Sequence, residues 1–529
     1  MSSRLVVKDA AWQLISRLIS AAFGFVVTKI MATYLGPLRY GDYNSILKYF
    51  AFWTALADLG LYVLAVKRLG ELKEQEKADP TNTKLKAEYW KFVGTRIVIM
   101  GAIYLVAIWI AYCVPSYRAN PYYLRGLPFG LLFSASFLLA GIQQLPLQIF
   151  WKMEKLSITL ITARITQIAI LVPIVYVFFK WINFATQPTG LSVIAFCLVL
   201  FSVLWSWLGQ NWEIHHRSKK ILPLKIIFDW QFIKDIIKKN RNYGVSYYFS
   251  SFHTLLPLLF LTWFYPTISG KDYSGTRWLA LGLIEILLII PAALGNSLLH
   301  KIPKYSQSNK LKSMGSLMNL MIWIGSIMAI NFWIFADVII KICSDKSYLG
   351  SFASISQWWS NQVMPFLGLV LLASFVKQVY NYVFVAVDRQ NMLLGINGVW
   401  VLIGIFLGLF MIPTWPYSLW RGLLWATITQ VVMELIFMWW AIWVGVRKDI
   451  SPILNGKILT RTLLVMGLFA LIGALITYNM QVGYLAFFLL GGVLNGLVLL
   501  VSWPFLKQMA RGLTVDETGT ELRPEEITA

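Results

Sequence analysis

The chain has 529 residues, of which 58% are hydrophobic and only 13% are charged, and its formal net charge is +22. A soluble globular domain carries about 25% charged residues, so this composition excludes an ordinary soluble domain. The lysines and arginines lie between apolar runs rather than on one folded module, so their number reports membrane topology and excludes nucleic acid as a partner.

Long apolar stretches recur from one end of the chain to the other. A helix needs about 20 such residues to cross the hydrocarbon of a bilayer, and the pattern predicts an all-α polytopic membrane protein with about 14 transmembrane helices. A barrel is excluded because its strands would alternate with a period of two. The expected spans are 10–34, 43–66, 91–114, 124–150, 157–181, 190–212, 243–264, 277–300, 314–336, 358–387, 391–412, 417–445, 460–480 and 483–506.

The first apolar run is too long for a cleavable signal peptide and lacks a small-residue cleavage site, so we expect it to remain as the first span. It is followed by "YLGPLRYGDY", residues 34–43, where two glycines and a proline predict a turn. Alternate loops carry most of the lysine and arginine, which predicts that both termini are cytoplasmic and that this turn faces outward.

The longest cationic loop follows the sixth span and contains "FDWQFIKDIIKKN". Its apolar and basic residues alternate at helical spacing, which predicts an amphipathic helix on the cytoplasmic headgroup surface. This loop divides the spans into six, six and two. The predicted domains are an N-terminal lobe (1–212), a cytoplasmic amphipathic linker (213–242), a C-terminal lobe (243–446), two further helices (447–508) and a cytoplasmic tail (509–529).

Two short motifs resemble a known family. "ATYLGPLRYGDYN" is similar to the "LGPxxYG" segment between the first two helices of Wzx-type oligosaccharide flippases, and "ADLGL" at 57–61 resembles a segment of their second helix. These flippases belong to the MOP superfamily, with the MurJ lipid II flippases and the MATE exporters. The resemblance implies two six-helix lobes around a central cavity, plus two C-terminal helices.

The resemblance also implies a function. The cargo would be undecaprenyl-pyrophosphate-linked oligosaccharide, moved by alternating access from the cytoplasmic to the outer leaflet of the cell inner membrane for cell-surface polysaccharide biosynthesis. Implied partners are this lipid-linked oligosaccharide and membrane lipids, and polysaccharide polymerase and export proteins are candidate partners.

Polar residues at membrane depth are costly and usually functional, and three lie on the first three spans. By residue count, Arg17 and Asp58 lie about 10 Å and 12 Å above the inner ends of consecutive helices. Asp58 is therefore expected to form a structural or gating pair with Arg17. Arg96 lies nearer the interface, where it would either contact cargo or extend its side chain to the surface.

Spans four and five add an arginine and several amides. Arg164 is expected at about the depth of Arg17, with Gln167 one turn further on, and Gln143 and Gln144 lie at that depth on span four. A guanidinium binds phosphate oxygens in bidentate geometry, and amides suit sugar hydroxyls. For Arg17 and Arg164 the alternative is a structural pair. The expected contacts of the anionic head group are Arg17, Arg164, Arg96, Gln143, Gln144 and Gln167.

The second half offers fewer candidates. His253 on span seven either lines the cavity or packs as a hydrogen-bonded residue. Glu434, near the middle of span twelve, is a candidate coupling acid, and the alternative is a salt bridge with Lys377 of span ten.

No catalytic or cofactor motif occurs. The sequence has no phosphate-binding loop and no "HExxH", and Cys113, Cys197 and Cys343 have no metal or disulfide spacing. We therefore expect a transporter without cofactor or metal. The alternatives are a MATE-like cation-coupled multidrug exporter, a lipid II flippase, and a membrane enzyme that polymerises polysaccharide.

Overall fold

The computed structural model describes residues 3–78, 84–150, 152–178, 190–238, 244–246, 248–249, 256, 268–288, 290–291, 307–344, 346–349, 360–386, 390–411, 419–447, 456–479 and 484–513. Every regular element in these ranges is a helix, in agreement with the expected all-α class. The chain forms two compact units: an N-terminal unit of residues 11–275, and a C-terminal unit of residues 276–529 together with residues 1–10.

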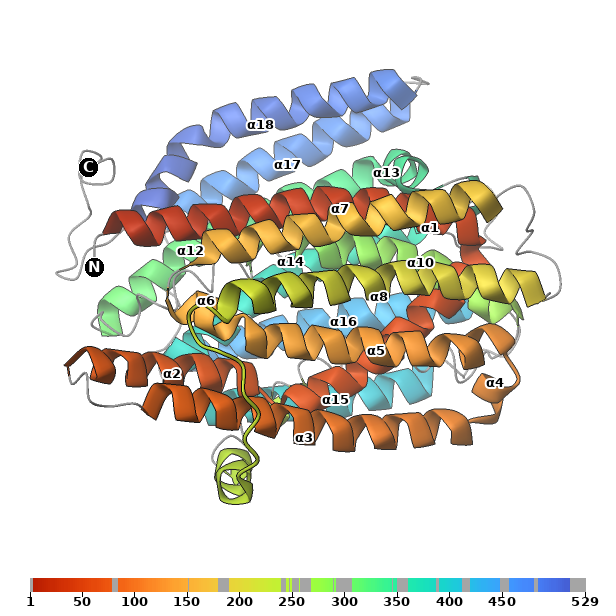
Figure 1. Cartoon of the computed structure of the whole chain (residues 1–529). Helices are drawn as coiled ribbons and strands as arrows, with labels where there is room; N and C mark the ends of the chain where they lie inside the picture. The colour runs from red at the N-terminus through yellow and green to blue at the C-terminus, as the bar shows by residue number, and fades with distance from the viewer. Residues whose placement is uncertain are drawn as a thin grey trace. The chain divides into compact units, whose positions relative to one another are not determined.

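The N-terminal unit begins with α1 (Ser3–Asp58), which is bent sharply at Gly36. Gly36 has φ 66° and ψ 171°, a conformation that is essentially restricted to glycine, and Pro37 follows it. The chain reverses direction there (Figure 1, red). The expected turn between the first two spans is therefore confirmed.

The second half of α1 ends earlier than predicted. Leu59 and Gly60 both have positive φ, 44° and 68°, and α2 (Leu61–Ala78) starts a new direction. Two successive left-handed residues cannot continue a right-handed helix. The expected span 43–66 is thus wrong at its C-terminal end, and the chain leaves α1 at Asp58.

In this unit α3 and α5 pack against the second half of α1, and α8 packs against α5 and α7. Asn120 caps α5 by accepting a hydrogen bond from the Tyr122 amide at 3.2 Å. A Cβ at Gly126 of α5 would lie 2.5 Å from the Ile46 side chain, so α1 and α5 approach closely where glycine leaves room. The other helices here are α3 (Lys84–Cys113), α4 (Pro115–Arg118), α5 (Pro121–Gln143), α6 (Leu145–Ile149), α7 (Met153–Phe178) and α8 (Gly190–Ser218).

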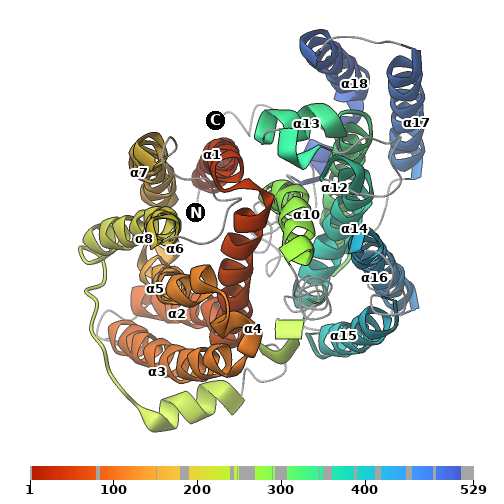
Figure 2. The same ribbon diagram turned by 90° about the vertical axis from the view of Figure 1, so that its right-hand side faces the viewer.

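The loop after α8 is held against α3. The Trp90 indole donates to the carbonyl of Pro223 at 2.7 Å, and the rings of Phe92 and Phe232 meet edge to face. Residues 230–238 form the predicted helix, which lies across α3 (Figure 2, yellow-green). Its expected place on the headgroup surface stays a prediction.

The C-terminal unit contains the described helices of expected spans eight to fourteen. Asn331 of α12 and Asn495 of α18 exchange amide hydrogen bonds of 2.9 and 2.8 Å, which joins the last helices to the rest of the unit. The helices are α10 (Ile268–Leu287), α12 (Gln307–Ile334), α13 (Ala336–Cys343), α14 (Ser360–Ala386), α15 (Gln390–Met411), α16 (Leu419–Arg447), α17 (Gly456–Asn479) and α18 (Tyr484–Leu513).

Within the described ranges, eleven helices are long and apolar enough to cross a membrane, and α1 counts once although it contains two expected spans. Most of the expected span 243–264 and part of 277–300 lie outside the described residues. The number of fourteen spans, the two six-helix lobes and the domain limits therefore stay predictions.

Candidate functional site

A buried ion pair joins the end of α1 to α3. The Arg96 guanidinium donates through Nη1 to the Asp58 carboxylate and, at 3.4 Å, to the Asp58 carbonyl. The Arg96 side chain is 4% exposed and that of Asp58 is 14% exposed. Opposite charge and hydrogen bonds compensate the lost hydration of such groups. The pair fixes the end of α1 against α3.

This pairing changes the roles expected from sequence. Arg96 does not extend towards the membrane surface, because its guanidinium is buried and bound to Asp58, so the snorkelling alternative is wrong. The side chain of Arg17 lies outside the described residues. The pairing of Arg17 with Asp58 stays a prediction. In the structure the Asp58 carboxylate already binds Arg96.

The expected amides lie at the break between α5 and α6. α5 ends at Gln143, Gln144 is its C-cap, and both side chains are half-buried. The Oε1 atom of Gln143 accepts no hydrogen bond within the described part of the chain. A Cβ at Gly141 would lie 3.6 Å from Nη2 of Arg96, so this break lies beside the Asp58–Arg96 pair. Amides and ion pair form one cluster.

Arg164 on α7 has a different environment. Its Nη1 donates to Oε1 of Gln167 at 2.9 Å, one turn further along the same helix. Tyr43 of α1 lies within electrostatic range of the guanidinium. No carboxylate in the described ranges pairs with Arg164. Its positive charge is therefore not neutralised by a fixed anion.

Arg96 and Arg164 lie beside different parts of α1. Their respective neighbours on α1, Asp58 and Tyr43, are fifteen positions apart, which is about 22 Å along a helix. A head group that binds Arg96 could not touch Arg164 at the same time in this conformation.

The hydrogen bond next to Arg17 gives its position along α7. The first half of α1 and α7 run side by side in the same direction (Figures 1 and 2), and the Ser16 hydroxyl donates to Ser157 at 3.0 Å. Arg17 is therefore level with position 158 of α7, and Arg164 lies about 9 Å further along. Residue counts from expected span ends did not give this offset because they assume equal helix ends and tilts.

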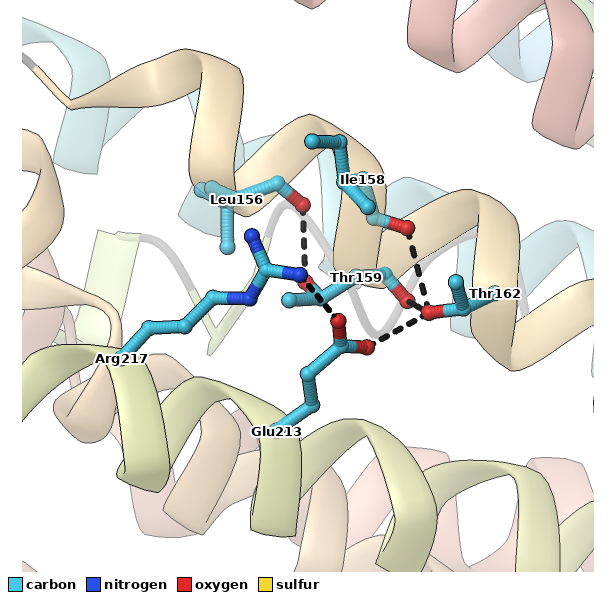
Figure 3. Close-up of polar contacts among 6 residues, drawn as sticks. All are labelled: Leu156, Ile158, Thr159, Thr162, Glu213 and Arg217. Atoms are coloured by element: carbon cyan, nitrogen blue, oxygen red, sulfur yellow. Dashed lines mark hydrogen bonds and ion pairs between the residues drawn. The ribbon is translucent and has the colours of Figure 1, made fainter.

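Sequence reasoning missed an acidic residue inside α8. Glu213 accepts hydrogen bonds from the Thr162 hydroxyl of α7, at 2.6 Å, and from Arg217 of α8 (Figure 3). The Thr162 hydroxyl also lies 3.1 Å from the carbonyls of Ile158 and Thr159. The predicted sixth span stopped at residue 212 because charge was taken to mark a loop. The spacing of Glu213 and Arg217, four positions apart, was the available signal for helix.

The turn at Gly36 leads into a polar cluster that sequence reasoning also missed. Arg39 pairs with Asp42 at 2.9 Å, and the Asn120 amide donates to the other Asp42 oxygen at 2.8 Å. The Arg39 guanidinium lies 3.9 Å from the centre of the Tyr122 ring. These contacts attach the turn to the start of α5, so "YLGPLRYGDY" is both a turn and a packing element.

The C-terminal unit contains the Lys377–Glu434 ion pair. Nζ of Lys377 lies 3.4 Å from both carboxylate oxygens of Glu434, which is 0% exposed. The rings of Trp400 and Phe437 lie 4.7 and 5.0 Å from the ammonium. Glu434 was predicted to be either a coupling acid or the partner of Lys377, and in the structure it forms the salt bridge with Lys377.

One turn away on α16, Gln430 accepts a hydrogen bond from Arg277 of α10, whose side chain is fully buried. Arg277 is the first residue of the expected span 277–300, and nothing in the sequence indicated that it would be buried. His253 lies outside the described residues, and its role stays a prediction.

Four carboxylates of these helices are each engaged by a basic side chain. Asp42, Asp58, Glu213 and Glu434 bind Arg39, Arg96, Arg217 and Lys377 respectively. Among the described residues, no group of three or more His, Cys, Asp or Glu could hold a metal ion. The arrangement therefore offers an arginine, Arg164, without a fixed anion and several amides, but no described carboxylate free of a cation at these positions.

Comparison with known proteins adds the family. The sequence profile described as "Polysaccharide biosynthesis protein" matches residues 6–290, just over half of the chain. Among curated protein sequences, none matches this chain significantly.

Several solved structures share the fold. An inward-facing multidrug resistance MATE family transporter of the MOP superfamily has TM-score 0.58 and 11% identity, over 83% of this chain and 98% of that chain. The lipid II flippase MurJ, in an inward closed conformation, has TM-score 0.58 and 13% identity, over 94% and 99%. A MOP superfamily transporter from Pyrococcus furiosus, whose binding pocket is described as reversed in polarity, has TM-score 0.52 and 12% identity, over 84% and 95%.

Proposed function

This chain belongs to the polysaccharide biosynthesis protein family, and we propose that its cargo is undecaprenyl-pyrophosphate-linked oligosaccharide. The family and the shared fold make it a membrane flippase or transporter. The direction that we propose is from the cytoplasmic to the outer leaflet of the cell inner membrane, by alternating access and with both termini cytoplasmic. Such a transporter would supply polysaccharide polymerase and export proteins.

The observation that carries the proposal is the charge balance within the N-terminal unit. Its described membrane-depth carboxylates are engaged by arginines, whereas Arg164 has only an amide and a tyrosine nearby. An uncompensated guanidinium inside a membrane protein is costly unless a mobile anion binds it or water hydrates it. A pyrophosphate provides such an anion, with oxygens that match the planar guanidinium.

Within this proposal the arginines have different roles. Arg164, with Gln167, binds the anionic head group, and Arg17 is a second contact nearer the predicted cytoplasmic end. Arg96 is a positioning residue, because its guanidinium is occupied by Asp58. Gln143 and Gln144 lie beside that pair and are assigned to the sugar hydroxyls.

The same charge balance disfavours a cation exporter. Organic cations would require carboxylates that are available to them, and the described candidates Asp58, Glu213 and Glu434 are each bound to Arg or Lys. A lipid II flippase would use the same head-group chemistry, since its cargo also carries a pyrophosphate. The two cargoes differ in their sugars.

The test is translocation of a fluorescent undecaprenyl-pyrophosphate oligosaccharide in proteoliposomes. We expect wild-type transport, and a loss of about tenfold to a hundredfold on Arg164→Gln, because a hydrogen bond to a charged group contributes roughly 1.5–3 kcal/mol. Arg118→Gln is the matched control, because Arg118 is an exposed arginine on the short helix α4, away from α7.

Three outcomes decide between the assignments. Transport that is lost in Arg164→Gln and kept in Arg118→Gln supports the head-group site. Equal transport by both variants and the wild type would remove Arg164 from the site while leaving the cargo class intact. Absence of transport by folded wild-type protein, with uptake of an organic cation instead, would replace the flippase proposal by the exporter.

A further inference from the structure

An apolar groove lies between α5 and α8 of the N-terminal unit. Its cavity volume is about 270 Å³. Arg125, on the first turns of α5, is its charged lining residue. The apolar lining comes from Phe129 of α5 and from Val193, Ile194, Leu198 and Phe201 of α8.

The groove faces outward from this unit. Ile194 is 53% exposed and Leu191, three positions before it on α8, is 47% exposed. Both helices have membrane-spanning length and composition. Apolar side chains on the surface of a spanning helix are in contact with lipid chains. The groove is therefore open to lipid rather than to water.

The dimensions fit one leaflet. α5 begins at Pro121 and α8 at Gly190, and Arg125 and Val193 lie close to these starts. From Val193 to Phe201 the groove runs for eight residues, or about 12 Å. Half of a bilayer's hydrocarbon is about 15 Å thick. The groove thus follows most of one leaflet, which is the outer leaflet in the predicted orientation.

Arg125, the positive charge at the end of the groove, favours an anionic lipid head group. No carboxylate lines the groove, and no acidic partner of the Arg125 guanidinium occurs among the described residues. The backbone carbonyl of Arg125 accepts a weak hydrogen bond from the Cys197 thiol at 3.7 Å, which leaves the guanidinium unoccupied. An arginine near the headgroup level attracts anionic lipid phosphates.

We propose that this groove is a binding site for an anionic glycerophospholipid. One acyl chain lies along Phe129, Ile194 and Leu198, and the phosphate binds Arg125. The site uses none of Arg164, Gln167 or Arg96. It therefore does not depend on the identity of the cargo.

The test is native mass spectrometry of the purified full-length protein, titrated with phosphatidylglycerol and with phosphatidylcholine of the same chains. Removing one surface charge weakens binding of an anionic lipid by about fivefold. We therefore expect Arg125→Gln to lower phosphatidylglycerol retention about fivefold. Leu198→Trp, which fills the groove, should lower retention of both lipids.

Two controls match these variants. Arg118→Gln removes an exposed arginine near the same helix ends, and Leu208→Trp enlarges an exposed leucine of α8 outside the groove. Both should retain phosphatidylglycerol as the wild type does. Elution and thermal unfolding of each variant show whether it is folded.

Equal retention of phosphatidylglycerol by Arg125→Gln and Arg118→Gln would overturn the proposal, because binding of this lipid would then not depend on Arg125. Displacement of phosphatidylglycerol by undecaprenyl phosphate, with the same dependence on Arg125 and Leu198, would also overturn it and would assign the groove to the cargo's own chain. Failure of Leu198→Trp to fold leaves the Arg125 comparison to decide.

Discussion

Three ion pairs are buried among the described residues, and the Lys377–Glu434 pair is the most enclosed of them. Glu434 has no exposed surface, and two aromatic rings lie against the partner ammonium. The Trp400 indole donates to the carbonyl of Met433 at 2.6 Å, which fixes the ring over the ion pair. Such a pair is costly to break, because each ion would be left buried without compensation.

We predict that Glu434→Gln destabilises the protein strongly. The substitution keeps the shape of the side chain and removes its charge, so the buried Lys377 ammonium loses its counter-ion. The expected loss is about 3–5 kcal/mol of unfolding free energy, the usual cost of breaking a buried pair. Thermal unfolding of the detergent-purified variant measures it.

The double variant Lys377→Met with Glu434→Leu is the control. It removes both charges and fills the space with apolar atoms, which is commonly neutral or stabilising. We expect it to unfold near the wild-type temperature. A double variant that is no more stable than Glu434→Gln would show that the carboxylate has a role beyond neutralising Lys377.

At the scale of single residues, sequence predicted the Lys377–Glu434 pair as one of two alternatives but did not predict the partner that Asp58 has in the structure. Counting residues along a helix gives a position on its axis, and Arg96, Asp58, Lys377 and Glu434 were all found this way. It does not say which helices are neighbours. Asp58 was therefore assigned to Arg17 on the preceding span, whereas in the structure it binds Arg96 of α3.

At the scale of elements, the bend in α1 depends on one backbone conformation. Gly36 has positive φ and extended ψ, and a Cβ added there would meet nothing within 4 Å. Any cost of a larger residue is therefore backbone strain and not a clash. The bend decides where the second half of α1 lies, and with it the positions of Tyr43 and Asp58.

We predict that Gly36→Ala lowers the unfolding free energy by roughly 1–3 kcal/mol, the cost of holding a non-glycine residue in that conformation. Gly101→Ala is the matched control, because Gly101 lies within α3 and its added Cβ also meets nothing within 4 Å. There alanine should stabilise the helix by up to about 1 kcal/mol. Equal effects of the two substitutions would show that the bend does not constrain residue 36.

The linker helix is attached to the first part of α3 by an ion pair whose carboxylate, Asp229, lies outside the spanning segments. Asp229 binds Lys91 at 2.8 Å and also accepts the amide of Phe232 at 3.0 Å, which caps the helix. The hydrogen bond from Lys91, followed by that from the Phe232 amide, lowers the pKa of Asp229 below its ordinary value of 3.8. A lowered pKa in the folded state stabilises the attachment above pH 3.8, and this contribution is lost as the pH falls through the folded value.

We therefore predict that the linker stays attached from pH 8 down to about pH 4 and loosens as the pH falls below that, most clearly at high salt, which screens this partly exposed pair. Spin labels at Lys86→Cys and Gln231→Cys, both exposed positions, report the separation of α3 and the linker helix. Asp229→Asn should show the loosened distribution already at pH 7. An unchanged distribution at pH 3 in the parent protein would contradict the role of this carboxylate.

The positions of the helices were predicted well from the sequence, whereas the residues at which they end were predicted poorly. Long apolar runs must form helices in a membrane because no water satisfies their backbone groups, and α3 and α12 lie where hydropathy predicted them. The end of α1 at Asp58 was missed because Leu59 continues the apolar run while its backbone turns left-handed. The prediction ended span six at residue 212 because charged residues follow it. The helix continues there because Glu213 and Arg217 neutralise one another.

At the scale of the whole molecule, the distribution of charge predicts orientation. The described cations after α8 include Lys219 and Lys220, at the end of the N-terminal unit opposite to the start of α5. Loops rich in lysine and arginine remain on the cytoplasmic side of a membrane. This asymmetry also decides the direction of transport, since the proposed loading begins at the cytoplasmic leaflet.

We predict that a cysteine at Ala119, before α5, is labelled by a membrane-impermeant maleimide in intact cells, and that one at Lys220, after α8, is labelled only when the membrane is opened. Both positions are exposed, and the three native cysteines must first be replaced by serine. Labelling in the reverse order would place the cationic linker outside, against the rule that charge sets topology. It would also put the start of α5, with Arg125 and its lipid groove, in the cytoplasmic leaflet, and would reverse the direction in which Arg17 and then Arg164 meet the cargo.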